Sequence, residues 1–228
     1  MEADAAKRAA AQAAALLIDD GARVGLGTGS TARHFIIALG ERVREGLRVS
    51  AVPTSIASAE LATQNGIPVV GLDAHGLDIA VDGADQVDPA LRLIKGRGGA
   101  IVREKIVAAA ARRFIVIVDG SKLCDRLQGQ VPVEVVEFGM ERTLAVLEQT
   151  RGRFSLRRGA DGDMLRTDNG NLLADGWFDV IDDPEALAAH LDATPGVVGH
   201  GMFLGLTDLV LVGGDDGSVR RVPARENS

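Results

Sequence analysis

The 228-residue chain has few aromatic residues, one cysteine and no excess of positive charge, and each shortage excludes a class of function. Only 3% of the residues are aromatic and none is tyrosine, so stacking platforms for single-stranded nucleic acid are not expected. The net charge of −7 argues against a surface for duplex DNA, which requires clustered cations. Cys124 has no partner for an intrachain disulfide, which is typical of a reducing compartment, and we expect it to be a buried thiol rather than a nucleophile.

Long apolar runs are also missing, and none approaches the length of a membrane span. Residues 1–4 are acidic, and the alanine-rich run behind them is interrupted by Lys7, Arg8 and Gln12. A signal peptide has a basic start and an unbroken apolar stretch. We therefore expect a cytoplasmic protein that interacts with neither membranes nor nucleic acid.

Short apolar runs alternate with helical patterns in the first half of the chain. We predict strands at residues 22–26, 47–52, 67–72, 79–81 and 114–118, and helices at 3–18, 30–44, 55–63 and 99–111. This alternation predicts an α/β fold with a doubly wound, mainly parallel sheet.

The pattern changes near residue 128. Strands at 133–136, 153–157 and 172–180 and helices at 140–149 and 184–191 predict a small α+β second domain, with a hairpin around residues 168–170. A second hairpin at 208–212 and 218–222 is expected to return to the main sheet. The predicted domains are residues 1–127 plus 202–228 for the catalytic α/β domain, and 128–201 for the small domain.

Four polar or glycine-rich turns follow predicted strands. They are residues 25–31 (Gly-Leu-Gly-Thr-Gly-Ser-Thr), 53–55 (Pro-Thr-Ser), 82–85 (Asp-Gly-Ala-Asp) and 119–122 (Asp-Gly-Ser-Lys). Ligands of open α/β sheets bind beyond the carboxyl ends of the strands. Since all four turns are expected at that edge, they predict one shared site.

The turn at residues 25–31 joins a predicted strand to a predicted helix. Its glycines allow a backbone concavity lined with N–H groups, and a helix N-terminus favours phosphate. A dinucleotide site is disfavoured because Ser30 replaces the third fingerprint glycine and no acid ends the next strand. A Walker loop is excluded because no Gly-Lys-Ser/Thr follows. These residues alone fit a phosphate site and a tight turn capped by Ser30 equally well.

Asp82 and Asp85 follow a strand that is expected to be buried. Such a pair suits proton transfer, hydroxyl recognition or a divalent metal, while aspartates that cap a turn are a common structural alternative. A metal is less favoured than hydroxyl recognition, because the four histidines show no ligand pairing.

A second glycine-rich segment, residues 95–99 (Lys-Gly-Arg-Gly-Gly), leads into a helix that carries Arg103, Glu104 and Lys105. The positions three or four residues from Glu104 are small or apolar. A carboxylate among apolar neighbours suits a general base, because its pKa tends to rise. A charge network that merely satisfies itself is the simpler explanation from these residues alone.

In this order, the segments resemble the ribose-5-phosphate isomerase A family. The motifs are GLGTGST at 25–31, VDGADQVD at 81–88, KGRGGA at 95–100, REK at 103–105, DGSK at 119–122, PVEV at 132–135 and TDNGN at 167–171. A single motif would be weak, whereas the ordered set is highly specific and spans nearly the whole chain. Residues 127–131 and 201–206 depart from the family pattern.

The resemblance implies interconversion of ribose 5-phosphate and ribulose 5-phosphate through a cis-enediolate, in the non-oxidative pentose phosphate pathway, by a homodimer or homotetramer without cofactor or metal. It implies that Glu104 is the base, that Asp82 and Asp85 bind sugar hydroxyls and assist ring opening, and that Lys95 stabilises the enediolate oxygen. The residues it implies for substrate binding are Lys7, Thr28, Gly29, Ser30, Thr31, Asp82, Gly83, Ala84, Asp85, Lys95, Gly96, Arg97, Gly98 and Lys122.

Two alternatives use a similar fold. A non-enzymatic sugar-phosphate sensor would normally carry a DNA-binding segment, and the single helix predicted at 3–18 is too short for a helix-turn-helix. A CoA-transferase-like enzyme would use a glutamate as nucleophile, and the predicted phosphate turn beside paired aspartates favours the isomerase.

Overall fold

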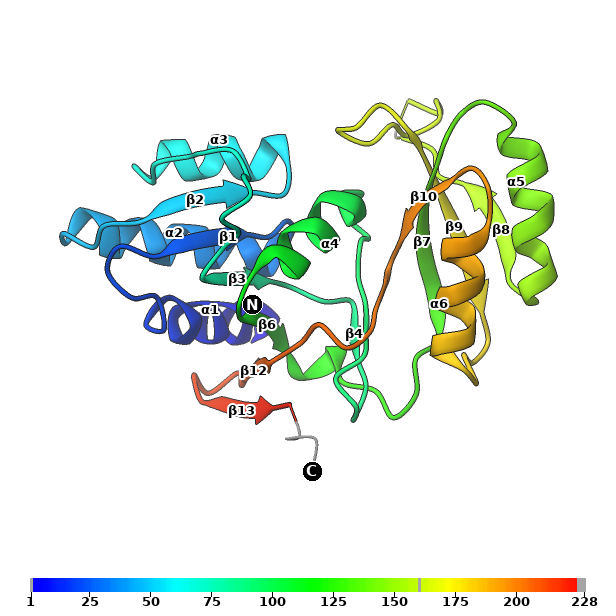
Figure 1. The fold of residues 1–228 in the computed structure, drawn as a ribbon. Coiled ribbons are helices and arrows are strands. Elements are labelled where there is room, and N and C mark those ends of the chain that lie inside the picture. The colour runs from blue at the N-terminus through cyan, green and yellow to red at the C-terminus, as the bar shows by residue number, and fades with distance from the viewer. Residues whose placement is uncertain (1, 160, 225–228) are drawn as a thin grey trace. The chain divides into compact units, whose positions relative to one another are not determined.

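The computed structural model describes residues 2–159 and 161–224, which form two compact units (Figure 1). The described residues of the first unit are 2–84, 103–123 and 205–224, and those of the second are 85–102, 124–159 and 161–204.

A six-stranded sheet with the order β13-β12-β6-β3-β1-β2 forms the centre of the first unit. All neighbouring pairs are parallel except β12 and β13, which form the predicted C-terminal hairpin. β2 and β3 flank β1 on opposite sides, so the predicted doubly wound, mainly parallel sheet is confirmed. The strands are β1 (Arg23–Leu26), β2 (Ser50–Pro53), β3 (Ile79–Asp82), β6 (Phe114–Asp119), β12 (Leu209–Gly213) and β13 (Val219–Pro223).

Helices cover both faces of this sheet. They are α1 (Glu2–Ala15), α2 (Ser30–Arg44), α3 (Ile56–Gln64), α4 (Ile101–Ala110) and the short 3-10 helix η1 (Gly120–Lys122). α1 and α2 lie side by side, and their apolar residues form one core with Val24 and Leu26 of β1 (Figure 1). Gly25 points to the opposite face, because side chains alternate along a strand. There a Cβ on Gly25 would lie 2.5 Å from Cγ1 of Val107 in α4, so glycine permits the close approach of that helix.

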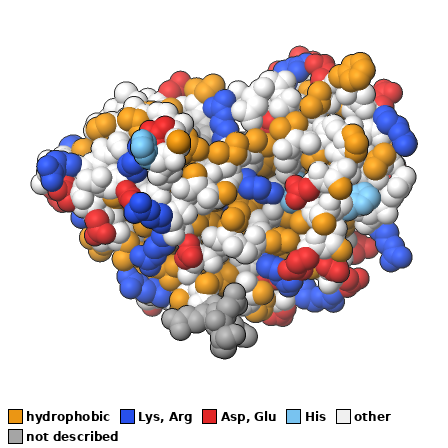
Figure 2. Space-filling model, viewed as in Figure 1, with side chains coloured by type: hydrophobic (Ala, Val, Ile, Leu, Met, Phe, Trp, Pro, Cys, Tyr) orange, Lys and Arg blue, Asp and Glu red, His pale blue; other side chains and the backbone are white. Residues whose placement is uncertain are grey.

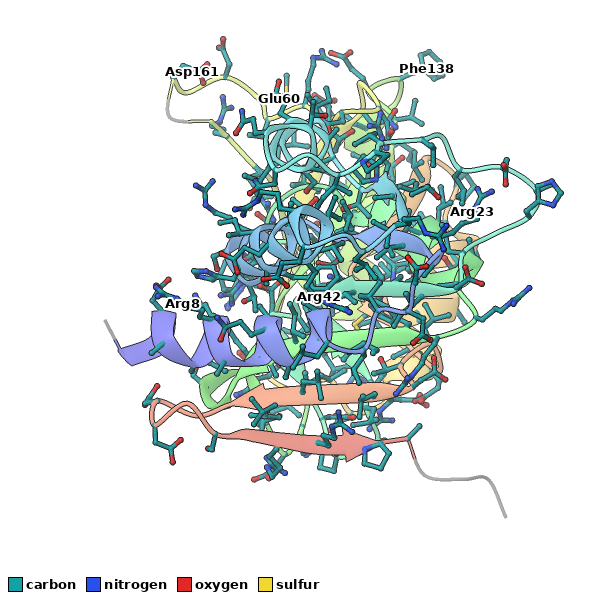
Figure 3. All side chains as sticks on the ribbon, turned by 90° about the vertical axis from the view of Figure 1, so that its left-hand side faces the viewer. Arg8, Arg23, Arg42, Glu60, Phe138 and Asp161 are labelled. Atoms are coloured by element: carbon teal, nitrogen blue, oxygen red, sulfur yellow. The ribbon has the colours of Figure 1, made fainter. Side chains whose placement is uncertain are left out.

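Arg42 of α2 closes the C-terminal end of α1. Its Nη1 donates to the carbonyl oxygens of Ala15 and Ile18, groups that a helix end leaves without intrahelical partners. Figure 3 shows Arg42 beside α1, with Arg8 farther along the same helix. The contact fixes α1, which carries Lys7, against α2.

An antiparallel sheet with the order β10-β7-β9-β8 dominates the second unit. Its strands and helices are β7 (Gly129–Val135), β8 (Arg153–Leu156), β9 (Leu172–Phe178), β10 (Val197–His200), α5 (Met140–Leu147), η2 (Glu148–Thr150) and α6 (Pro184–Ala193). α5 and α6 pack on one face, against Val131, Val133 and Val135 (Figure 1). Pro132 and Glu134 therefore point to the other face, which we call the face opposite α5 and α6.

A three-stranded sheet with the order β11-β5-β4 completes the second unit. It consists of β4 (Gln86–Val87), β5 (Leu93–Ile94) and β11 (Met202–Phe203). Sequence periodicity did not reveal these strands, since two residues are too short to show alternation. Their pairing also explains why the units differ from the predicted domains at residues 85–102: β5 pairs with β11, so Asp85–Val102 groups with the second unit. Elsewhere the units change at residues 123/124 and 204/205, beside the predicted boundaries at 127/128 and 201/202.

The strand predicted at residues 67–72 is wrong. Only Val69 forms an isolated bridge, to Ala51 of β2. Val69, Val70 and Leu72 are each more than a third exposed, so this segment lies past the edge of the sheet without a covering layer. The predicted turn at residues 168–170 is present, but the intervening segment forms further bridges, Arg158 to Met164 and Arg166 to Leu172, before β9 begins.

Among the described residues, no helix is long and apolar enough to cross a membrane. On the face shown in Figure 2, lysine and arginine side chains are interspersed with aspartate and glutamate. This mixture agrees with the negative net charge of the chain.

Candidate active site

The parallel pairing places the four predicted turns at the carboxyl edge of the six-stranded sheet, because β1, β2, β3 and β6 all run in the same direction. α4 runs the opposite way between β3 and β6. At its C-terminal end the carbonyl of Ala110 accepts the N–H of Leu77, just before β3 begins (2.9 Å). Its N-terminal turn, with Glu104, therefore points toward the carboxyl edge that carries the turns.

Asp82, at the end of β3, joins two of these turns. Its Oδ1 accepts the N–H groups of Thr28 (3.1 Å) and Gly83 (2.7 Å), and its side chain is buried. A Cβ on Gly27 would lie 2.0 Å from the same oxygen. The glycine is therefore required for the carboxylate to reach the turn. Gly83 in turn lies beside Thr31, since an added Cβ would be 3.6 Å from that of Thr31.

The hydroxyl of Thr28 lies in a cluster of hydroxyl groups. Its Oγ1 is 2.7 Å from Oγ1 of Thr54, donates to Ser55 (2.8 Å) and is 3.1 Å from Oγ of Ser58. Thr54 and Ser58 donate in turn to the carbonyl oxygens of Leu26 and Gly27. The cluster fixes the backbone of the turn at 25–31, so Thr28 supports the turn through its side chain. Ser58 is missing from the predicted site, although its spacing from the N-cap Ser55 was a usable signal.

The start of α2 has the features of an anion site. Gly29 is the N-cap, with φ +111°, and no side chain caps the first turn. The alternative in which Ser30 only caps the turn is therefore excluded, since Ser30 is the first helical residue. Its Oγ instead accepts a hydrogen bond from Nζ of Lys7 (3.1 Å). A lysine, a hydroxyl and an uncapped helix N-terminus thus come together in the first unit.

Glu104 lies on the buried stripe of α4, together with Ile101, Val107 and Ala108. It is 3% exposed, whereas Arg103 and Lys105 are only partly buried. The helix is not buried all round, because Ile106 is 51% exposed. The sequence thus places one carboxylate, rather than a whole polar turn, on the apolar face against the sheet.

Lys95 directly follows β5 in the second unit and is 2% exposed. Its backbone N–H donates to the carbonyl of Gly201 (2.9 Å), and its Nζ lies 5.4 Å from the ring centroid of Phe203. A cation over an aromatic face is held electrostatically. Phe203 was not predicted as a site residue, because nothing in the sequence pairs residue 203 with residue 95.

Asp85 and Arg97 contact each other within the second unit. The backbone N–H of Arg97 donates to Oδ2 of Asp85 (3.1 Å), and Nε of Arg97 lies 3.8 Å from Oδ1. Gly96, between Lys95 and Arg97, has φ +96°, and an added Cβ would lie 1.5 Å from Cγ2 of Ile101. Only glycine fits this position.

The predicted site residues are therefore divided between the units. Those in the first unit are Lys7, Thr28, Gly29, Ser30, Thr31, Asp82, Gly83, Ala84, Glu104 and Lys122; those in the second are Asp85, Lys95, Gly96, Arg97 and Gly98. Lys122 ends η1, whose N-cap Asp119 accepts the N–H of Ser121 (2.9 Å). Within the described residues, no group of three or more His, Cys, Asp or Glu side chains is arranged to hold a metal ion.

Cys124 belongs to the hydrogen-bond network of β4. Its Sγ donates weakly to the carbonyl of Val87 (3.6 Å). Burial, with a smaller contribution from the Asp88 carboxylate, raises the pKa of the thiol. The thiolate needed for nucleophilic chemistry is thereby disfavoured at neutral pH.

Fold and site together define an α/β protein with an open helix start and buried carboxylates at one edge of its parallel sheet. The model of the family "Ribose 5-phosphate isomerase A (phosphoriboisomerase A)" matches residues 50–217. The chain is 50% identical over 218 residues to ribose-5-phosphate isomerase A of Roseiflexus castenholzii, covering 93% of each chain. It is 46% identical over 226 residues to that of Sinorhizobium fredii, covering 96% of this chain and 97% of the relative. The chain belongs to the ribose 5-phosphate isomerase A family.

Solved structures agree with this family. Ribose 5-phosphate isomerase A from Methanocaldococcus jannaschii matches with a TM-score of 0.91 at 41% identity, covering 95% of this chain and 97% of that one. A D-ribose-5-phosphate isomerase in complex with phospho-erythronic acid matches with a TM-score of 0.93 at 40% identity, covering 98% and 100%.

Proposed function

We propose that this chain is an aldose–ketose isomerase that interconverts ribose 5-phosphate and ribulose 5-phosphate in the non-oxidative pentose phosphate pathway. The observation that carries the proposal is Glu104, a carboxylate that is 3% exposed on the apolar stripe of α4, at the end of the helix nearest the carboxyl edge of the sheet. A base in such surroundings is shielded from water and can return the proton that it removes. Its membership of the family supports the same reaction.

The phosphate binds, on this proposal, at the start of α2. The N–H groups of its uncapped first turn and the hydroxyls of Ser30 and Thr31 donate to the phosphate oxygens. Lys7 supplies a positive charge at Ser30, and Lys122 a second one from the turn after β6. Phospho-erythronic acid, which is bound to a structural relative, carries both a phosphate and a carboxylate, as expected for a ligand of such a site.

The proton transfer is assigned to the carboxylates. Glu104 removes the proton from C2 of the open-chain aldose and delivers it to C1, which leaves the ketose after passage through a cis-enediolate. Asp82 and Asp85 hold the sugar hydroxyls, assist ring opening and move the proton between O1 and O2. The ammonium of Lys95 and the N–H groups of Gly96, Arg97 and Gly98 stabilise the negative charge that develops on the enediolate oxygen. No step requires a metal or a cofactor.

The test is turnover of each pentose phosphate by the purified chain, with and without excess EDTA. We expect conversion in both directions and no effect of EDTA. Binding of ribose 5-phosphate without conversion of either sugar would favour a sugar-phosphate sensor. Loss of activity in EDTA, restored by a divalent cation, would contradict the metal-free assignment.

A homodimer or homotetramer is proposed together with this function. Phe138, which precedes α5, is 93% exposed and projects from the second unit in Figure 3. Val136, which directly follows β7, and Val198 in the neighbouring strand β10 are each at least 40% exposed. Exposed apolar groups of this kind favour association, and mass photometry of the native chain and of Phe138→Ser measures it. The single cysteine supports a cytoplasmic location.

A further inference from the structure

Residues 95–99 lie on the face of the four-stranded sheet opposite α5 and α6, and this contact has no role in the reaction as proposed so far. An added Cβ on Gly96 would lie 3.7 Å from Cβ of Pro132 in β7, and one on Gly99 would lie 3.6 Å from Cδ2 of Leu173 in β9. Both sheet residues point to the same face as Asp175, which is paired with Pro132 and lies two residues after Leu173. This face of the sheet therefore packs against residues 95–99.

A charged pair on the same face of the sheet contacts residues 95–99. Arg157 follows β8 directly, and its Nη1 donates to the backbone carbonyl of Arg97 (2.6 Å). Its Nε donates to Oδ2 of Asp175 (2.8 Å) and its Nη2 to Oδ1 of the same carboxylate. The side chains are 16% and 9% exposed. A planar guanidinium with a two-pronged carboxylate contact and a third bond to the carbonyl is fixed in orientation.

The backbone of Arg157 is fixed as well. Its N–H donates to the carbonyl of Leu173 (2.7 Å), and its carbonyl accepts the N–H of Leu165 (2.8 Å). The backbone that carries the guanidinium is therefore hydrogen-bonded on both sides. Its position is set by the sheet and not by the glycine-rich segment that it touches.

Two consequences follow for the proposed catalytic groups. In a planar trans peptide the carbonyl and the N–H point in opposite directions. Because the carbonyl of Arg97 points to Arg157, the N–H of Gly98 points away from Arg157. The preceding N–H, that of Arg97 itself, donates to Asp85 (3.1 Å). Holding the Arg97 carbonyl thus orients one proposed enediolate donor, the N–H of Gly98, next to the residue whose own N–H contacts Asp85.

We propose that Arg157, oriented by Asp175, is a positioning residue for the isomerase reaction: it fixes the Arg97–Gly98 peptide and thereby the direction of the Gly98 N–H. The role rests on the proposed function, because it concerns the geometry of groups assigned to the enediolate. Preorganised donors act on the transition state more than on the bound substrate. The effect of losing Arg157 should therefore appear in kcat rather than in KM.

The experiment compares Arg157→Ala, Arg157→Lys and Asp175→Asn with the matched control Arg158→Ala. Arg158 is the next residue and also donates to a loop carbonyl, that of Gly162 (2.8 Å), but its side chain is exposed. We expect Arg157→Ala to lower kcat about 10- to 100-fold with KM changed less than about threefold. Lysine should restore part of kcat, and Asp175→Asn should give a smaller loss. The control should retain wild-type values.

Amide hydrogen exchange gives a readout that does not depend on activity. We expect faster exchange at Arg97 and Gly98 in Arg157→Ala, with the urea midpoint of the enzyme little changed. Wild-type kcat in Arg157→Ala would overturn the proposal, as would a kcat loss that merely follows a lower urea midpoint. If Arg157→Ala does not fold, the same comparison is made with Asp175→Asn. Inactivity of the wild type and of Arg158→Ala would instead refute the proposed function, while hydrogen exchange would still test the positioning.

Discussion

The two glycine-rich segments of this chain are held in place by different means. Residues 25–31 are fixed within the first unit by backbone bonds, by the carboxylate of Asp82 and by the hydroxyl groups around Thr28. Residues 95–99 are fixed within the second unit by an ion pair from the sheet and by glycines that let side chains pass closely. A phosphate site needs many N–H groups in a stable turn, whereas a site for developing charge needs a few donors in fixed directions.

The largest expected effect comes from a substitution that disrupts the second segment, residues 95–99. In Gly96→Ala the new Cβ would lie 1.5 Å from the buried Ile101, and the residue would have to keep φ +96°. Strain and overpacking together should lower the free energy of unfolding by about 2–5 kcal/mol. Urea denaturation measures this, with Gly71→Ala as a control, because an added Cβ there contacts nothing within 4 Å. Equal stability of both variants would mean that the close approach at Gly96 is not required.

Gly27→Ala disrupts the first segment, residues 25–31, by overpacking alone. The new Cβ would lie 2.0 Å from Oδ1 of Asp82, which would have to leave the N–H groups of Thr28 and Gly83. We expect a loss of about 1–3 kcal/mol in stability and a clear rise in KM, since the phosphate turn loses its brace. Steady-state kinetics and denaturation are measured on the same sample. An unchanged KM would show that Asp82 does not shape the turn.

Lys7→Ala tests the proposed phosphate contact at the first segment without disturbing the fold. Lys7 contacts Ser30 at the start of α2, so its loss should raise KM about tenfold, or about 1.4 kcal/mol, with little change in kcat. The control is Arg8→Ala, which removes the neighbouring charge, one that pairs instead with Asp4. Similar kinetics for both variants would argue for a general charge effect and against a contact at Ser30.

The smallest effect concerns pH and involves neither segment. Hydrogen bonds from the side chain and backbone of Arg48 lower the pKa of Asp20 from 3.8 to about 2. A lowered pKa stabilises the folded state above the unfolded value, and this contribution is lost as the pH falls toward about 2. Asp20→Asn should therefore lower the melting temperature slightly at neutral pH, and the difference should shrink between about pH 4 and pH 2. A gap that stays constant over this range would exclude the ion pair as its cause.

The two segments also differ in how far they could be predicted from the sequence. The turn at 25–31 and Asp82 were predictable because they stand at the ends of strands whose parallel order follows from the βαβ pattern. The ring of Phe203 was not, because its contact with Lys95 depends on how side chains are directed in space. Arg157 and Asp175 meet across a hairpin whose intervening bridges hide the register. The strand at 67–72 failed because only Val69 pairs with the edge strand β2 and the apolar side chains of residues 69–72 stay more than a third exposed.

The central claim is that Glu104 transfers the proton while the first segment only holds the substrate. The most direct measurement is the turnover of ribose 5-phosphate by Glu104→Gln, with the binding of phospho-erythronic acid measured by calorimetry on the same preparation. We predict a kcat lower by about 10²–10⁴-fold and an affinity for the acid close to that of the wild type. Near-normal turnover in this variant would contradict the assignment of Glu104 as the base.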